Sequence, residues 1–585
     1  GTARRRACWP SASASTTDGG VARPLRTGRG WLIAAACVAL LALLPVAALA
    51  FAAMGGDGSL WPHLLQNVLP AALKDTLLLL LGTGVLVVAL GTGSAWLVTA
   101  YDFRGRRIFE WALLLPLAVP TYIMAYAWMD LLHPIGPLQT GLRSLLGLAN
   151  PQDLRLPDLR SLPGCVLVLG FVLYPYVYLT TRAVFLMQAS GLLEAARTLG
   201  QGPRAVFLRV ALPMARPAIA VGTALALMEA INDIGASELL GVRTLTVSIY
   251  STWVNRSDLA GAAQIALAML AVVVVLLVIE RLARRRQRYA GGAQKSRRMA
   301  PQRIGGSRAA AVAALLALPV LLGFVAPAGY LVAKAVERMR FAGFPPQLLE
   351  VTLDTLKLAT LATAFTLLAA MAVIYALRLR PGGGAATFER IATLGYAIPG
   401  TVLGIGLLTP MGAADDLLAS LIESVTGYVP GLLLLGTSVA LVYAYSTRFL
   451  AVAAGNLEAG FTRIPAALDQ AGRTLGATSS GVLGRIHLPL LRPALAAAAL
   501  LVFVDCMKEL PATLLLRPLD VETLATHLYA EAVRGTYEDG AIAALLILVA
   551  GLVPVILLSR VGAHAARKEH PEQAIAPLSG DSYAN

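Results

Sequence analysis

Long apolar segments alternate with short polar ones along almost the whole chain. Each apolar segment holds about twenty residues, the length that crosses the hydrocarbon core of a bilayer as an α-helix. Twelve of them follow one another, at residues 31–51, 76–100, 111–131, 163–187, 217–236, 262–282, 309–335, 353–377, 391–411, 430–455, 493–512 and 540–560. The pattern therefore predicts an all-α, polytopic membrane protein with about twelve transmembrane helices.

The twelve segments form two sets of six, which indicates an internal repeat. We predict a first half at 31–282 and a second half at 309–562, joined by a basic, Gly-rich cytoplasmic linker at 283–308. A basic, disordered arm at 1–30 and a tail at 563–585 complete the chain. The triplet Asp75-Thr76-Leu77 near the second span returns as Asp354-Thr355-Leu356 near the eighth. Each Asp is expected to cap the helix that follows it.

Basic residues gather on one side of the predicted spans. They lie before the first span, after the second, between the fourth and fifth, and between the halves, as in Arg4, Arg29, Arg104, Arg197, Arg209, Arg284, Arg298 and Arg303. The loops on the other side carry acids instead, including Asp57, Asp158, Asp416, Glu423, Asp520 and Glu522. Because basic loops stay in the cytoplasm, both termini are expected there.

The composition agrees with a membrane protein: 57% of residues are hydrophobic, 14% are charged, and the mean hydropathy is +0.70. The net charge of +15 is explained by this sidedness and by attraction to anionic lipid, so the lipid bilayer is an expected partner and nucleic acid is not. The four cysteines form no C-x-x-C pair and no ligand cluster emerges, so no metal site is predicted.

A polar, Arg-bearing loop lies between the fourth and fifth spans of each half. The first copy reads Glu194 to Gly200, then Leu212-Pro213; the second reads Gln470 to Gly476, then Leu488-Pro489, with the same offset throughout. Leu192, Ala195, Ala196 and Leu199 share one helical face, and Leu468, Ala471, Gly472 and Leu475 repeat that spacing. We predict two short helices at 190–202 and 466–478, each ended by its glycine and each displaying an apolar face to a partner.

These loops resemble the cytoplasmic coupling loops of bacterial ATP-binding-cassette importer permeases. The first copy has the Glu-Ala-Ala, three residues, Gly pattern of that family, whereas Gln470-Ala471-Gly472 departs from it and removes one carboxylate. The resemblance implies coupling residues Glu194, Ala195, Ala196, Gly200, Leu212, Pro213, Gln470, Ala471, Gly472, Gly476, Leu488 and Pro489. It also implies two cytoplasmic ATP-binding subunits, a periplasmic solute-binding protein and a multi-pass place in the bacterial inner membrane.

No cofactor is expected on this chain. It contains no Gly-Lys dipeptide and therefore no P-loop, so ATP would be bound by a separate subunit. No nucleophile–base or metal-ligand constellation lies within the spans, which disfavours an enzyme. An ion-coupled secondary transporter remains the alternative from another class.

Carboxylates follow each coupling loop by one span. Glu229 and Asp233 in the first half correspond to Asp505 and Glu509 in the second, again at the offset of the coupling loops, and each pair has i, i+4 spacing. We expect each pair on one helical face, lining the translocation path opposite a cationic substrate, since charge inside a bilayer usually faces a cavity or partner. The alternative is a structural role, with neutralisation by Lys508 or Arg243 or exposure to water at the interface.

Prolines interrupt the third span and its counterpart in the second half. Pro116 and Pro120 occupy the former, and Pro399 the latter. Prolines kink a membrane helix and free backbone carbonyls, so paired breaks at matching places in two halves indicate the translocation path.

The stretch Met507-Lys508-Glu509-Leu510-Pro511 up to Arg517-Pro518 resembles fused ferric-iron permeases, as does Tyr396 to Thr401. This resemblance implies that ferric iron passes from the binding protein to the cytoplasm by ATP-driven alternating access. An importer of thiamine or another small solute is the nearest alternative.

Overall fold

The computed structural model describes residues 28–55, 61–148, 150, 152–187, 196, 198–285 and 301–568. Most of the predicted N-terminal arm and linker, and residues 569–585 of the tail, lie outside this part of the chain. Glu194 and Ala195 of the first coupling loop also lie outside it.

The first half is a succession of helices. Its elements are α1 (Arg29–Ala52), α2 (Trp61–His63), α3 (Leu69–Ala100), β1 (Tyr101–Asp102), α4 (Arg106–Ala112), α5 (Thr121–Leu131), α6 (Pro137–Leu146), α7 (Leu162–Met187), α9 (Pro203–Val206), α10 (Leu212–Asn232), α11 (Gly235–Leu239), α12 (Leu245–Arg256) and α13 (Leu259–Arg285). Short 3₁₀ or π turns at Leu64–Val68, Leu115–Ala118 and Phe207–Ala211 join some of them.

The second half repeats this order. Its elements are β2 (Gln302–Arg303), α14 (Gly306–Val320), α15 (Ala326–Ala342), α16 (Gln347–Leu379), α17 (Gly384–Thr393), α18 (Gly400–Thr426), α19 (Ser438–Phe461), α20 (Ala466–Thr474), α21 (Ser479–Val482), α22 (Leu488–Met507), α23 (Pro511–Leu516), α24 (Leu524–Arg534) and α25 (Tyr537–Lys568). Turns at Leu394–Ala397 and Leu483–His487 occupy places like those of Leu115–Ala118 and Phe207–Ala211, whereas the π turn Leu321–Val325 lies within the first span of the half, between α14 and α15.

The prediction of an all-α membrane protein is confirmed. Within the described residues, eleven helices are long and apolar enough to cross a membrane, and a bent pair, Arg106–Ala118 with Thr121–Leu131, makes a twelfth span. Each predicted span has a counterpart among these twelve. The two-residue strands β1 and β2 pair in parallel and tie the start of the second half to the loop after α3.

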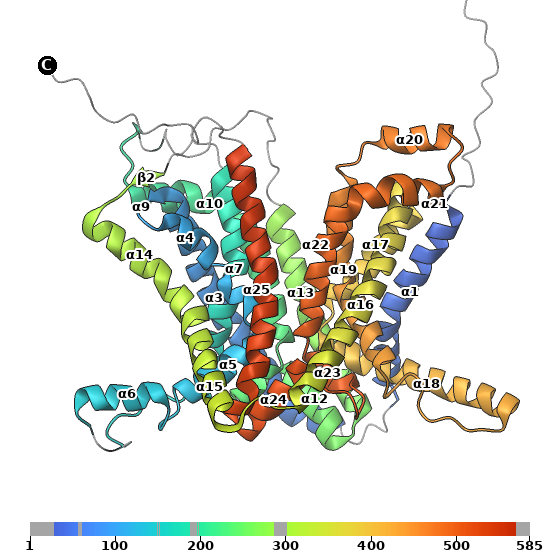
Figure 1. The fold of residues 1–585 in the computed structure, drawn as a ribbon, viewed down its shortest axis with the longest axis horizontal. Coiled ribbons are helices and arrows are strands. Elements are labelled where there is room, and N and C mark those ends of the chain that lie inside the picture. Colours follow the sequence, from blue (N-terminus) through green and yellow to red (C-terminus); the bar gives the residue numbers. More distant parts are fainter. Residues whose placement is uncertain are drawn as a thin grey trace, which may run out of the picture.

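The first span of each half packs against the other half. Trp31 of α1 meets Tyr375 of α16 edge to face, with 5.0 Å between ring centroids, and the Tyr443 hydroxyl of α19 donates to the Leu41 carbonyl. Reciprocally, the Trp128 indole of α5 donates to the Leu322 carbonyl between α14 and α15 at 3.2 Å. Figure 1 shows α1 along the α16–α19 side and α14 along the α3–α4 side. The exchange interlocks the two halves, which the sequence repeat did not predict.

Two threonines anchor the same helix start in both halves. The Leu245 amide, at the beginning of α12, donates to Thr76 Oγ1 at 2.9 Å, and the Leu524 amide of α24 donates to Thr355 Oγ1 at 2.8 Å. The expectation that Asp75 and Asp354 cap helices was wrong, because α3 begins at Leu69 and α16 at Gln347. In each triplet the threonine, not the aspartate, satisfies the end of a helix, and it does so at long range.

The third span of the first half breaks sharply at its prolines. Its two pieces meet at 93°, with Val119 and Pro120 extended between them. Ile398 and Pro399 are extended in the same way between the Leu394–Ala397 turn and α18. The predicted kinks are therefore complete breaks, each followed by a new helix that starts inside the membrane region.

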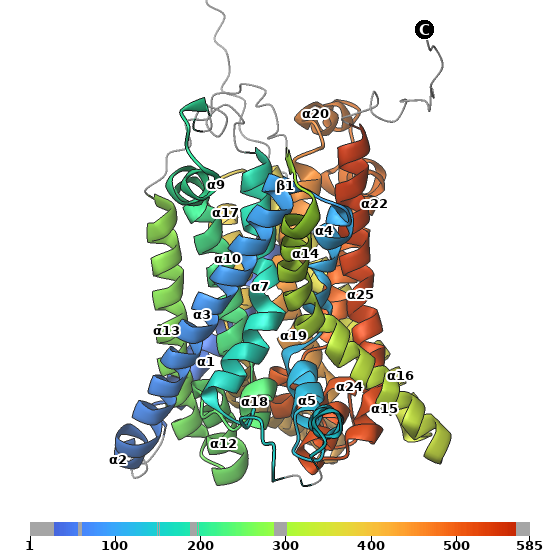
Figure 2. The ribbon, with the colours of Figure 1, turned by 90° about the vertical axis from the view of Figure 1, so that its left-hand side faces the viewer.

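The two ends of the molecule differ. The short helices α9 and α20 lie at one end, and α6, α12 and α24 lie at the other (Figures 1 and 2). The positive-inside argument assigns the end with α20 to the cytoplasm.

This orientation can be tested by cysteine labelling in a variant that lacks the native Cys8, Cys37, Cys165 and Cys506. We expect an impermeant maleimide to label Asp416→Cys and Asp520→Cys in intact cells, because both exposed side chains belong to the predicted outer loops. Arg104→Cys, exposed beyond α3 at the other end, should react only after permeabilisation. The reverse pattern would overturn the orientation.

Candidate functional site

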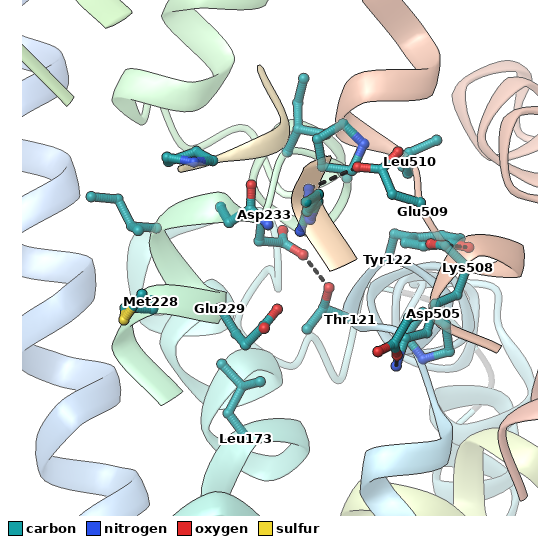
Figure 3. A pocket seen from close by; sticks show the side chains of 18 of the residues that line it. Thr121, Tyr122, Leu173, Met228, Glu229, Asp233, Asp505, Lys508, Glu509 and Leu510 are labelled. Carbon is teal, nitrogen blue, oxygen red and sulfur yellow. Dashed lines mark hydrogen bonds and ion pairs between the residues drawn. The ribbon is translucent and has the colours of Figure 1, made fainter. Parts of the chain in front are cut away.

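The broken spans enclose a cavity between the two halves. It has a volume of about 150 Å³, and its walls come from the Pro120 and Pro399 breaks, from α7, and from the ends of α10 and α22. All four carboxylates singled out from the sequence line it: Glu229, Asp233, Asp505 and Glu509. Figure 3 shows these side chains with Thr121, Tyr122 and Lys508 around the same space.

Asp233 caps a helix. Its Oδ1 accepts hydrogen bonds from the Ala236 and Ser237 amides, at 2.9 and 3.1 Å, and its Oδ2 accepts one from the Thr121 hydroxyl. The amides belong to the first turn of α11, whose unpaired N–H groups attract a carboxylate. The Thr121 contact ties this cap to the start of α5, so one buried acid holds two helix beginnings together.

Glu509 caps a helix in the second half and also forms an ion pair. Its oxygens accept from the Ala512 amide at 3.1 Å and the Thr513 amide at 3.2 Å, at the start of α23. Arg448 of α19 lies 2.8 Å from Oε1, and the Thr513 hydroxyl donates to Oε2 at the same distance. The carboxylate is 1% exposed and the guanidinium 11%, so this is a buried ion pair. Buried pairs are costly to break from one side.

The expectation that each i, i+4 pair shares a helical face was wrong. The helix α10 ends at Asn232 and α22 at Met507, so Asp233 and Glu509 lie beyond the last helical residue. The chain turns at both places and then begins α11 and α23. Spacing alone did not show this, because i, i+4 spacing is the same whether the helix continues or stops between the two residues.

The other two acids differ from each other. Asp505 pairs with Lys508 at 2.8 Å, which bears out the structural alternative for this residue. Glu229 accepts a hydrogen bond from the hydroxyl of Tyr396, which belongs to the other half, at 3.0 Å. No ion pair of the described residues includes Glu229. The other proposed neutraliser, Arg243, pairs with no acid in this part of the chain.

Charge is therefore distributed unequally around the cavity. The two cations that line it, Arg448 and Lys508, both come from the second half, and the offset of the repeat places Val172 and Asn232 at the corresponding positions of the first. Four carboxylates against two cations leave a formal excess of two negative charges among the described lining residues. Sequence comparison of the halves could have found this asymmetry at Val172 and Arg448, but not that the two positions face a cavity.

No tight metal site is present in the described residues, since no group of three or more His, Cys, Asp or Glu side chains could hold an ion there. The acids are separated by helix starts, cations and a phenol. The arrangement can lower the cost of passing a charged solute, but it offers no closed set of ligands.

The coupling loops carry the glycines in the predicted conformation. Gly200 has φ 77° and Gly476 has φ 79°, the left-handed region that favours glycine. The Gln201 amide donates to the Ala196 carbonyl and the Ala477 amide to the Gly472 carbonyl, at 3.1 and 3.0 Å, so the chain turns in the same way at both glycines. The predicted glycine C-cap is confirmed for α20, whereas most of the first coupling helix lies outside the described residues.

The second coupling helix, α20, stands away from the bundle (Figure 1). It buries Gly472, and an added Cβ there would lie 2.9 Å from Val482 Cγ2. Gln470 and Ala471 are exposed, and Leu475 is 88% exposed. The predicted apolar face of α20 is thus only partly available to a partner: Gly472 packs against Val482, whereas Leu475 is exposed.

Each Leu-Pro pair lies just after a π turn. Leu212-Pro213 follows Phe207–Ala211, and Leu488-Pro489 follows Leu483–His487, so the helices run on through the prolines as continuous spans from Pro203 and from Ser479. A wider turn accommodates a residue that lacks an amide donor.

The second loop has an anchor that the sequence did not reveal. Asp469 of α20 pairs with His487 at 2.5 Å and with Arg378 of α16 at 2.9 Å, and Arg378 also donates to the Ile464 carbonyl at 2.8 Å. Aromatic rings pack near this place in both halves: Trp96 meets Phe185 and Phe207 in the first, and Tyr375 meets Phe461 and His487 in the second. In the second half the ionic cluster adds to this aromatic packing.

Comparison with known proteins gives a consistent picture. Residues 86–289 match the family described as "Binding-protein-dependent transport system inner membrane component". Similar proteins include the Fe(3+)-transport system permease protein FbpB 2 of Haemophilus influenzae, 22% identical over 83% of this chain and 89% of that protein. A probable molybdenum ABC transporter permease protein of Haloferax volcanii is 32% identical over 43% of this chain and 90% of its own length. The sulfate transport system permease protein CysW of Escherichia coli K12 is 29% identical over 39% and 77%.

The buried Glu509–Arg448 pair allows a stability test. Glu509→Gln leaves the guanidinium without its counter-charge, which should lower the free energy of unfolding by about 3–5 kcal/mol. Arg448→Met in the same chain should recover most of that loss. Asp505→Asn is the matched control, because its partner Lys508 is 34% exposed and reaches water. Thermal unfolding of the four proteins in detergent measures the effect, and equal losses in Glu509→Gln and Asp505→Asn would contradict it.

Proposed function

We propose that this chain, which belongs to the family of binding-protein-dependent transport system inner membrane components, passes a cation through the membrane, and that the cation is ferric iron. The family makes the chain a multi-pass inner-membrane permease of an ABC importer and a transport component, not an enzyme. It also implies a solute-binding protein and an ATPase as partners. The proposal concerns the substrate and the way in which the partners act.

The observation that carries the substrate proposal is the excess of negative charge around the cavity. Molybdate and sulfate are dianions, and an acidic lining in a medium of low dielectric would repel them. The same lining lowers the cost of admitting a polyvalent cation. The Fe(3+)-transport permease of Haemophilus influenzae is also a relative that extends over most of this chain. Thiamine, an organic cation, is the remaining alternative with the same sign of charge.

The coupling loops supply the second part of the proposal. Two ATPase subunits, which would bind the ATP, dock on the exposed α20 and on the corresponding segment near Gly200. Their closure on ATP moves both loops and rocks the halves between inward- and outward-facing states, each favoured by a different ligand. The exposure of Leu475 and Gln470 supports such a docking role. A secondary transporter would have no use for two exposed loops of this form.

Uptake by reconstituted permease, ATPase and binding protein tests the substrate. We expect ATP-dependent uptake of ⁵⁵Fe(III), and no uptake of labelled molybdate or sulfate above that of vesicles without permease. Labelled thiamine, which is also a cation, is the control for selectivity between cations. Transport of either oxoanion at the rate of iron would refute the proposal.

A glycine substitution tests coupling. Gly476→Val places a β-branched residue at φ 79°, where side chains are strained by about 1–2 kcal/mol, and should disturb the end of α20. We expect ATPase association and uptake to fall at least about fivefold while membrane abundance is kept, because an added Cβ at Gly476 meets no neighbouring atom. Gly484→Val is the control, since Gly484 is exposed, lies nearby and has no positive φ. Normal ATPase binding and uptake in Gly476→Val would remove the coupling role from this loop.

A further inference from the structure

We propose that Glu229, Tyr396 and Tyr176 form the contact at which the cation crosses between the halves. This inference rests on the proposed function in one respect, that the solute is a cation. The carboxylate and the two phenols offer oxygen ligands, which hard cations prefer.

Of the four acids in the cavity wall, Glu229 is the one that neither caps a helix nor forms an ion pair among the described residues. Asp233 caps α11, Glu509 caps α23 and pairs with Arg448, and Asp505 pairs with Lys508. In the described part of the chain Glu229 forms no ion pair and caps no helix start, and it accepts a hydrogen bond from the Tyr396 hydroxyl at 3.0 Å. Figure 3 shows its carboxylate at the cavity, beside Asp233 and facing the side that bears Asp505. A passing cation can therefore reach Glu229 without breaking an ion pair or a helix cap.

Two phenols accompany it. Tyr396 and Tyr176 both line the same cavity. The Tyr396 hydroxyl donates its proton to Glu229 and keeps its oxygen lone pairs for another contact. The Tyr176 hydroxyl makes no hydrogen bond to any described residue. Three oxygen groups are fewer than the six or so that a hard cation takes in a tight protein site, so water would complete the shell and the ion would not be trapped.

The contact is shared between the halves. Glu229 lies in α10 and Tyr176 in α7, both of the first half, whereas Tyr396 belongs to the Leu394–Ala397 turn of the second. A second bond crosses nearby, from the Gly400 amide to Asn232 Oδ1 at 2.8 Å. When the halves rock, Tyr396 moves away from Glu229, and the ion keeps only the ligands of the first half. The contact is therefore strongest in one conformation, which is what directional release requires.

Terbium(III) tests this contact directly, since it is a hard trivalent ion whose luminescence is sensitised by nearby tyrosine. The permease–ATPase complex in nanodiscs would be titrated with Tb³⁺ under tyrosine excitation. We expect Glu229→Gln to weaken the apparent Tb³⁺ affinity, measured from the sensitised luminescence, about tenfold, because the one charged ligand is lost. Tyr396→Phe and Tyr176→Phe should lower its intensity. Glu229→Asp, which keeps the charge, should restore much of the affinity and excludes misfolding as the cause.

Glu350→Gln and Tyr443→Phe are the controls, one removing an exposed carboxylate and the other a hydroxyl outside this cavity. Both should leave the titration unchanged. Equal Tb³⁺ affinity in Glu229→Gln and wild type overturns the inference, as does an equal loss in Glu350→Gln. The proposed function fails separately: if wild type does not take up ⁵⁵Fe(III) yet its Tb³⁺ affinity depends on Glu229, the contact stands and the substrate is another cation.

Discussion

The fold depends on how helix ends are satisfied inside a membrane. Backbone amides at a helix start have no partner in their own helix, and lipid offers none. Here the chain breaks at Pro120 and Pro399, and two spans stop at Asn232 and Met507, so helices begin and end inside the bundle beside the cavity. Asp233 and Glu509 meet this need by accepting from the first turns of α11 and α23. A cavity between the halves is possible because these buried carboxylates hold its walls.

The halves share a backbone plan and differ in charge. Val172 and Asn232 in the first half stand where the second half has Arg448 and Lys508. Glu509 and Asp505 are thereby compensated within their own half, whereas Glu229 contacts a phenol from the other half. Duplication supplied two equivalent walls, and substitution then gave one of them the free negative charge. A path with one acidic wall and one compensated wall suits a cation that must leave as readily as it enters.

An ionic cluster fastens the second coupling loop. α20 is held by Asp469, His487 and Arg378, beside aromatic packing that both halves have. The exchanged first spans, α1 on the second half and α14 on the first, make the halves depend on each other.

The sequence by itself determined the membrane class, the twelve spans, the repeat and the turns at the two glycines. Each of these depends on local physics or on simple repetition: the length of an apolar run, the restriction at Gly200 and Gly476, or the constant offset between the two copies. Tertiary structure decided the use of each acid. Asp233, Glu509, Asp505 and Glu229 look alike in the sequence, and their roles differ because their partners, Thr121, Arg448, Lys508 and Tyr396, reach them through folding. The true ends of α10 and α22 were hidden for a related reason: i, i+4 spacing is the same whether a helix continues or stops between the two residues, and the contacts of Asp233 and Glu509 with the next helix starts form only on folding.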